Sequence, residues 1–218
     1  MRKGVRLLAV SLVGLLCATS ALAQQRGLTD GQIRSAEVEV PRLVEQLELE
    51  PGATVADVGA GFGAWTVRFA GWTGEAGHVY ATEIGDRQLA FLRETAEQDR
   101  LANVTVIEGA VDDTNLPDAC CDAILARDAF HHFTEPAAMI ESLAAALRPG
   151  GRLAIIDFPP LENSSVPEGV PADRGGHGVP PEVVEREIGA VLTHESTTLE
   201  WSSRGPGRSL FLVVFRKP

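Results

Sequence analysis

The fold is decided by the stretch Thr54-Val55-Ala56-Asp57-Val58-Gly59-Ala60-Gly61-Phe62-Gly63-Ala64-Trp65-Thr66. A short run of apolar and β-branched residues breaks into three alternate glycines, and a helical pattern follows. Glycine allows a tight turn and a close approach of backbone to a ligand, because it has no Cβ. The stretch therefore predicts a strand, a tight turn and a helix. Glycine clusters also form ordinary turns, so the loop alone is weak evidence for a ligand.

Two acidic residues add to that evidence. Asp57 lies two residues before Gly59, and Glu83 ends the next predicted strand. Ligands of open α/β sheets bind at the carboxyl ends of the strands, where both residues are expected to lie. The loop, Asp57 and Glu83 therefore predict a small-ligand site.

Outward from the loop, short strands alternate with helical patterns. This alternation predicts βαβ crossovers and a mainly parallel, doubly wound α/β sheet. Two β-like segments around the turn at 205–207 predict a closing hairpin that is antiparallel to its neighbours. Pro41 is expected to kink the first helix or to divide it. The expected helices are 30–47, 64–70, 86–99, 135–147 and 181–190, and the expected strands are 54–58, 78–83, 104–108, 123–126, 152–158, 196–201 and 209–216.

Composition favours a single acidic domain. The 218 residues are 44% hydrophobic and 22% charged, which is enough for one large domain, expected over 24–218. The formal net charge of -11 argues against a nucleic-acid partner, because phosphate contacts need clustered Lys and Arg. A small molecule or a protein is the expected partner.

The first 23 residues have the pattern of a secretory signal peptide. Three basic residues precede an apolar run over 7–17, and Ala-Leu-Ala at 21–23 provides a cleavage site. The prediction is an exported protein, periplasmic or secreted, with no membrane contact once the signal is removed. An uncleaved signal would instead anchor the chain in the membrane. Cys17 allows a lipoprotein interpretation, but Leu16 precedes it where a small residue is expected.

Two further segments carry structural expectations. Cys120 and Cys121 are adjacent, and adjacent cysteines rarely have the geometry of a bridge, so no disulfide is expected. Residues 159–179 are rich in Pro, Gly, Ser and Asn and are expected to form one long loop or lid.

Three segments together resemble a class I S-adenosylmethionine-dependent methyltransferase of the methyltransferase type 11 group. They are 55–63, the Tyr-Ala-Thr-Glu run at 80–83, and 147–153, which contains Pro-Gly-Gly. The resemblance covers about 33–215. It implies a Rossmann-like sheet of seven strands, S-adenosyl-L-methionine as cofactor, and methyl transfer to a small-molecule acceptor.

The resemblance also implies cofactor-binding residues. The glycines would approach the methionyl part, Asp57 would support the loop and the cofactor amino group, and Glu83 would accept the ribose hydroxyls. An acidic residue after the third strand would approach the adenine; Asp112 is the first choice and Asp113 the second. The implied cofactor-binding residues are Asp57, Gly59, Gly61, Gly63, Glu83, Ile84, Asp112 and Asp113.

The stretch Arg127-Asp128-Ala129-Phe130-His131-His132-Phe133 resembles the family's motif at the cofactor and substrate edge. His131 is the expected pocket residue and candidate catalytic base, unless it only packs or caps a helix. The other candidate bases are Asp128, His132 and His177. No metal site is expected, because neighbouring side chains at a strand end diverge and no other ligand set has metal spacing. Near His177, Gly178 stands where relatives carry an arginine, which leaves the acceptor open.

Direct displacement at a sulfonium mainly requires alignment and exclusion of water, so no covalent residue is expected. Two alternatives remain. A nicotinamide-dependent dehydrogenase also fits the looser pattern Gly59-x-Gly61-x-x-Ala64 with Glu83 downstream. A catalytically silent binding domain would explain an export signal on a protein whose cofactor is made in the cytoplasm.

Overall fold

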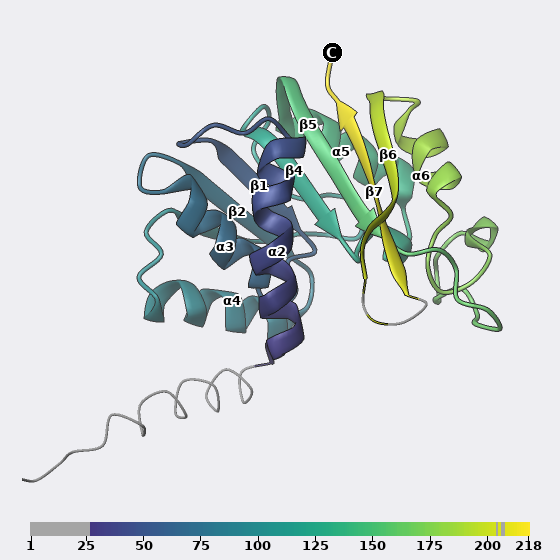
Figure 1. Ribbon diagram of the computed structural model, residues 1–218, viewed down its shortest axis with the longest axis horizontal. Helices are drawn as coiled ribbons and strands as arrows, with labels where there is room; N and C mark the ends of the chain where they lie inside the picture. Colours follow the sequence, from purple (N-terminus) through teal and green to yellow (C-terminus); the bar gives the residue numbers. More distant parts are fainter. Residues whose placement is uncertain (1–26, 204, 206–207) are drawn as a thin grey trace, which may run out of the picture.

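The computed structural model describes residues 27–203, 205 and 208–218, so the predicted signal peptide at 1–23 lies outside the described residues. Seven strands form one sheet in the order β3-β2-β1-β4-β5-β7-β6 (Figure 1). None of the helices among the described residues is long and apolar enough to span a membrane. The helices are α2 Asp30–Gln46, α3 Ala64–Thr73, α4 Asp86–Gln98, α5 Pro136–Ala146 and α6 Pro181–Ile188. The strands are β1 Thr54–Val58, β2 His78–Glu83, β3 Val104–Glu108, β4 Cys121–Arg127, β5 Leu147–Asp157, β6 Thr193–Ser203 and β7 Ser209–Arg216.

The predicted fold class is confirmed. Strands β1 to β5 run parallel, and β7 is antiparallel to both β5 and β6. From β1 the chain proceeds to β2 and β3 on one side, and then returns to place β4 on the other side of β1. The order therefore reverses at β1 and β4, and the crevice beyond their carboxyl ends is where such sheets bind ligands.

Two apolar layers cover the sheet, one on each face. Val55 of β1 points to the layer that includes α2 and α3, whereas Ala56 and Val58 point to the layer that includes α5 and α6. In Figure 1, α2 crosses in front of the sheet and α5 lies behind it. Because β1 is buried on both faces, its apolar residues point to both layers, as expected for a central parallel strand.

Helix α2 differs from expectation at Pro41. One helix runs through the proline, so of the two outcomes expected there, a kink or a division, the division is wrong. Proline removes only its own bond to the carbonyl of Glu37, an exposed residue. Ala36 and Val40 before the proline and Leu43 after it are buried in the same apolar layer, so both halves of the helix pack against the sheet.

The expected turn at 148–151 lies within β5. Leu147 pairs with Cys121 and Arg152 pairs with Ala123, so the four residues between them bulge out of the ladder. Gly150 takes a positive φ of 80° in this bulge. The Pro-Gly-Gly sequence therefore does make a turn, but the strand pairs on both sides of it.

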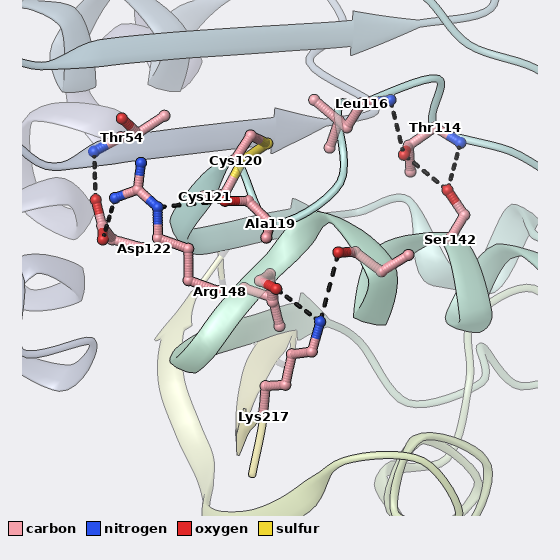
Figure 2. The surroundings of a disulfide bond; sticks show 12 residues. Thr54, Thr114, Leu116, Ala119, Cys120, Cys121, Asp122, Ser142, Arg148 and Lys217 are labelled. Atoms are coloured by element: carbon pink, nitrogen blue, oxygen red, sulfur yellow. Dashed lines mark hydrogen bonds and ion pairs between the residues drawn. A yellow bond between two sulfur atoms is a disulfide. The ribbon is translucent and has the colours of Figure 1, made fainter.

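The expectation of no disulfide is wrong, because Cys120 and Cys121 are bonded to each other. They lie where the chain enters β4, directly after Ala119, which bends the backbone with a φ of 48°. Figure 2 shows Arg148 beside the pair; its Nε donates to the Ala119 carbonyl (3.3 Å), and its guanidinium pairs with Asp122 (2.7 Å). The bend brings the two sulfurs together, and an extended strand would have separated them.

The loop at 159–179 contains one short 3-10 turn, Ala172–Arg174, and is fastened at both ends. Leu161 N donates to the carbonyl of His177 (2.9 Å), and His177 N donates to Ser164 Oγ (2.8 Å). Val179 N donates to the carbonyl of Phe158 at the end of β5 (3.0 Å). These bonds hold His177 against the carboxyl end of the sheet.

Candidate functional site

The glycine loop after β1 is a tight turn in which each glycine has a positive φ. Gly59, Gly61 and Gly63 have φ values of 69°, 56° and 81°. A Cβ on Gly59 would lie 2.8 Å from the Ala129 Cβ, and one on Gly63 would lie 2.7 Å from Leu92 Cδ2. A Cβ on Gly61 would meet nothing within 4 Å. Two glycines are thus required by packing, and the third leaves backbone open to a ligand.

Glu83 is held by the backbone of this loop and of its own. Gly61 N donates to Glu83 Oε2 (2.8 Å), and Ile84 N and Gly85 N donate to Oε1 (2.8 and 3.3 Å). A carboxylate has about four acceptor positions, so one remains after these three bonds. Glu83 can therefore still accept a hydroxyl while its orientation is fixed.

Asp57 lies beneath the loop rather than in it. Its side chain is buried, and Thr66 Oγ1 of α3 donates to Asp57 Oδ2 (2.7 Å). Burial raises the pKa of Asp57 to about 6, while the hydrogen bonds from Thr66 oppose the shift and the charge of Glu83 adds to it. The Asp57 carboxyl therefore titrates near pH 6 in the free protein. A cationic ligand group beside it would stabilise the ionised form and lower its pKa.

A cavity of about 450 Å³ opens beside the loop, at the carboxyl ends of β1, β2 and β4. Four of the sequence-predicted residues line it: Gly59, Glu83, Ile84 and Asp113. Ile84 is 58% exposed, and Val111, which also lines the cavity, is 53% exposed. Two exposed aliphatic side chains at one cavity provide an apolar surface for a flat ring. Of the remaining predicted residues, Asp57, Gly61, Gly63, Asp112 and His131 are not in the lining.

The two aspartates after β3 are placed differently. Asp113 lines the cavity, and its Oδ1 accepts hydrogen bonds from Asn115 N (2.9 Å) and Ser142 Oγ (2.8 Å). These two bonds lower the pKa of the Asp113 carboxyl. Asp112 is exposed and outside the lining, so the structure places the second choice, not the first, at the cavity.

His131 is buried behind the cavity wall. Its Nδ1 lies 2.8 Å from Asp157 Oδ1, and its backbone N donates to Asp157 Oδ2 (3.1 Å). Asp157 ends β5 and is fully buried. His132, not His131, faces the cavity. The structure therefore gives His131 a fixed orientation and leaves its other ring nitrogen, Nε2, for a further partner.

Three histidines converge at this wall. The ring centroids of His131 and His132 are 3.9 Å apart, and that of His177 lies 5.0 Å from His131 and 5.6 Å from His132. The expectation that the adjacent side chains diverge is wrong, because both belong to a tight 3-10 turn, Phe130–His132, rather than to a strand. Burial lowers the pKa of His132, and the nearby His131 and His177 lower it further. The charge of Asp157 opposes this shift, but the net direction favours the neutral imidazole of His132.

A second, more polar cavity of about 830 Å³ lies between α2, the start of α3 and the end of β6. Asp128 lines both cavities and thus separates them. Glu39, 2% exposed, joins the floor: it accepts from Arg127 Nε (2.8 Å), Trp65 Nε1 (3.1 Å) and Ser202 Oγ (2.6 Å). This network ties α2, α3, β4 and β6 together directly beside the first cavity.

Several of these residues were missed by the sequence analysis. The contacts of Thr66, Glu39 and Asp157 join distant segments, and no local sequence pattern predicts such contacts. The sequence predicted His132 and His177 only as candidate bases. Their contact with each other and with His131 depends on the loop at 159–179, which has no periodicity. The signal that did exist was chemical: three of the five histidines in the chain fall in two short segments, one after the predicted strand 123–126 and one before the predicted helix 181–190.

Comparison with known proteins finds a family match for the part of the chain that holds the glycine loop and Glu83. Residues 55–151 match the family described as a methyltransferase domain. The chain is similar to the ubiquinone/menaquinone biosynthesis C-methyltransferase UbiE of Shewanella piezotolerans, with 30% identity over 116 residues. The alignment covers 53% of this chain and 46% of that protein. The chain thus spans about half the length of the curated relatives it matches.

Solved structures show the same fold over more of the chain. A SAM-dependent methyltransferase from Aquifex aeolicus has a TM-score of 0.64 at 21% identity and covers 94% of this chain and 98% of its own. The [4+2]-cyclase SpnF has a TM-score of 0.66 at 18% identity and covers 85% and 81%. Identities this low establish the fold alone, and the second name describes a different reaction. The fold is Rossmann-like, and the methyltransferase-domain match over residues 55–151 implies S-adenosylmethionine as the cofactor.

The residues present fit this cofactor. Gly61 leaves backbone open, Glu83 keeps an acceptor position for a ribose hydroxyl, and Ile84 and Val111 offer apolar cover for an adenine ring. The cavity volume lies within the range of about 300 to 1,000 Å³ that is usual for small-ligand sites.

Proposed function

We propose that the protein is an S-adenosylmethionine-dependent methyltransferase that acts on a small-molecule acceptor. The observation that carries the proposal is Glu83, whose carboxylate is fixed by three backbone N–H groups at the mouth of a cavity beside the glycine loop. That geometry suits a bound diol, and the family match supports methyl transfer rather than hydride transfer.

When bound, S-adenosylmethionine supplies a methyl group on a positively charged sulfur. The chain's own residues bind and align the reactants: the glycine loop and Glu83 hold the cofactor side, and Asp57 supports a cationic group from below. The second cavity lies on the other side of Asp128 and is the proposed acceptor site. Close placement of the two reactants accounts for most of the rate that a direct displacement needs.

The test is calorimetry of the full chain with S-adenosylmethionine and with S-adenosylhomocysteine. We expect binding with a Kd on the order of 1 to 100 μM, near ordinary KM values. No binding of either compound at about 1 mM would overturn the proposal. Binding of NAD in their place would indicate the dehydrogenase alternative.

The variant Glu83→Gln should weaken binding of the cofactor about tenfold or more, because it removes the charge from a partly buried acceptor that the backbone holds in place. Glu108→Gln is the matched control. Glu108 is level with Glu83 at the end of the neighbouring strand β3, but its side chain is 66% exposed and outside the cavity. Equal loss in both variants would contradict the assignment of Glu83.

Catalysis is tested separately, by transfer of a labelled methyl group to a panel of acceptors. Phenol and quinol rings belong first in the panel, because the curated relatives are named for ubiquinone and menaquinone biosynthesis. Cofactor binding without transfer to any acceptor would favour the alternative of a silent binding domain. Export, suggested by residues 1–23, is a separate proposal, tested by the location of the protein and its N-terminal sequence in the producing cell.

A further inference from the structure

We propose that His131, His132 and His177 bind a divalent transition-metal ion, of which Zn²⁺ is the representative, at the wall of the cofactor cavity. The candidate ligand atoms of the three imidazoles all lie within 4.8 Å of one another. Nitrogen ligands at about 2.0 to 2.1 Å from a tetrahedral ion are about 3.4 Å apart. Small rotations of the side chains are enough to close the difference.

A carboxylate that would support such a site already contacts His131. The Nδ1 of His131 lies 2.8 Å from Asp157 Oδ1, which leaves Nε2 as the ring nitrogen that would bind an ion. Asp157 is in turn fixed by the backbone N–H groups of His131 (3.1 Å) and Phe158 (2.9 Å). A carboxylate that orients a histidine in this way is the usual support of a metal-binding imidazole.

The third ligand is held by the loop at 159–179. The backbone N–H and carbonyl of His177 are both bonded, to Ser164 Oγ and to Leu161 N. The following residue, Gly178, packs so closely that a Cβ would lie 2.8 Å from the Phe158 carbonyl oxygen. The position of His177 beside the other two rings is therefore determined by the packing of the loop.

The chemistry of the ligands selects the ion. Three imidazoles without a carboxylate ligand favour Zn²⁺, Cu²⁺, Ni²⁺ or Fe²⁺ over Mg²⁺ and Ca²⁺, which prefer oxygen. Three protein ligands leave a fourth position open, as in catalytic zinc sites. His132 lines the cofactor cavity, so the open position would be next to it.

The experiment is a calorimetric titration of the chelator-treated full chain with Zn²⁺, without S-adenosylmethionine and without reductant. A Cys17→Ser background removes the one cysteine outside the disulfide pair. We expect one ion per chain, and visible absorption bands of tetrahedral Co²⁺ when Co²⁺ replaces Zn²⁺. His132→Ala and His177→Ala should each weaken binding at least about 100-fold, and Asp157→Asn about 10- to 100-fold.

His194→Ala is the matched control, because His194 lies on β6 outside the cluster and is bonded to Thr197 Oγ1 (2.9 Å). Circular dichroism verifies that each variant is folded. The proposal is overturned if Zn²⁺ does not bind at about 100 μM, or if binding survives both His132→Ala and His177→Ala. Calorimetry with S-adenosylmethionine on the same samples separates the metal proposal from the methyltransferase proposal. Zn²⁺ can bind to a chain that does not bind S-adenosylmethionine, and S-adenosylmethionine can bind to a chain that does not bind Zn²⁺.

Discussion

At the scale of single residues, Asp57 shows the conflict between stability and binding. Its carboxyl is buried and accepts hydrogen bonds from the side chain and the backbone of Thr66. An ionised carboxylate in such a place is costly, and the raised pKa of about 6 expresses that cost. A cationic ligand group nearby would offset it. The residue therefore serves the bound state better than the free protein.

The pH dependence of stability tests this description. The pKa of Asp57 in the folded chain is above its ordinary value of 3.8, so its contribution is fully present below about pH 4 and is lost as the pH rises through 6. Asp57→Asn should therefore gain in free energy of unfolding relative to the wild type between pH 4 and pH 7, by roughly 3 kcal/mol. Chemical denaturation at several pH values measures the difference. A difference that does not change with pH would contradict the raised pKa.

Gly59 provides a second test at this scale. Alanine there must adopt a positive φ and meet the Ala129 methyl group at 2.8 Å, so we expect Gly59→Ala to cost more than about 2 kcal/mol. Gly71→Ala is the control: Gly71 lies within α3 with nothing near its Cβ position, and alanine should stabilise it by about 0.5 to 1 kcal/mol. Thermal or urea unfolding gives both values. Equal effects of the two substitutions would contradict the packing described for the loop.

At the scale of elements, the buried Glu39 joins helix α2 to the sheet. It accepts hydrogen bonds from α3, β4 and β6, and the Arg127 guanidinium also lies 4.0 Å above the Trp65 ring. Such an ion pair contributes little to stability compared with an apolar core, but removing one partner leaves a buried charge. The hydrogen bonds of Glu39 therefore fix the position of α2, which lines the proposed acceptor cavity.

Glu39→Ala should cost about 3 to 5 kcal/mol, because the Arg127 charge would lose its main partner. Glu37→Ala is the control, since Glu37 pairs with Arg68 on the exposed side of the same helix and should change stability by less than about 1 kcal/mol. Urea denaturation measures both. A decrease of less than about 1 kcal/mol in the free energy of unfolding of Glu39→Ala would show that the contacts of Glu39 do not hold α2 in place.

Elements were predicted where the local pattern was strong and missed where distant contacts decide. The bounds of β1, β2 and β3 agree with expectation, because apolar runs between turn residues are sufficient to define strands. The continuity of α2 through Pro41 depends instead on its packing against the sheet. The bend at Ala119 that joins Cys120 to Cys121, and the place of His177, depend on loop contacts that have no period in the sequence.

At the scale of the whole molecule, the site lies at the reversal of the strand order, as the sequence predicted for a doubly wound sheet. The glycine loop follows β1, Glu83 ends β2, Asp128 follows β4 and Asp157 ends β5. Four separate segments meet only because parallel strands share one carboxyl edge. The site residues on strands were predictable for that reason, whereas the proposed acceptor cavity was not, since it is formed by α2, α3, β4 and β6, which lie far apart in the sequence.

Ligand binding at this site should therefore stabilise the entire fold. If S-adenosylhomocysteine binds only the folded chain, a concentration of 100 times Kd adds about 2.7 kcal/mol to the free energy of unfolding. We expect a rise in Tm of about 5 °C to 10 °C with the compound in the wild type and a much smaller rise in Glu83→Gln. Differential scanning calorimetry provides the measurement. An equal rise in both proteins would place the compound elsewhere.

The pairing of β1 also has a consequence for how the chain folds. Val55 lies between Val79 on one side and Ala123 on the other, so the central strand acquires its second neighbour only after β2, β3 and their helices have been made. Contacts between segments so far apart in sequence slow folding, because a long loop must close before they form. Until β4 arrives, one edge of β1 is exposed to other chains. Newly made protein is thus most prone to aggregate in that interval, and a partner that shields this edge would increase the yield of folded protein.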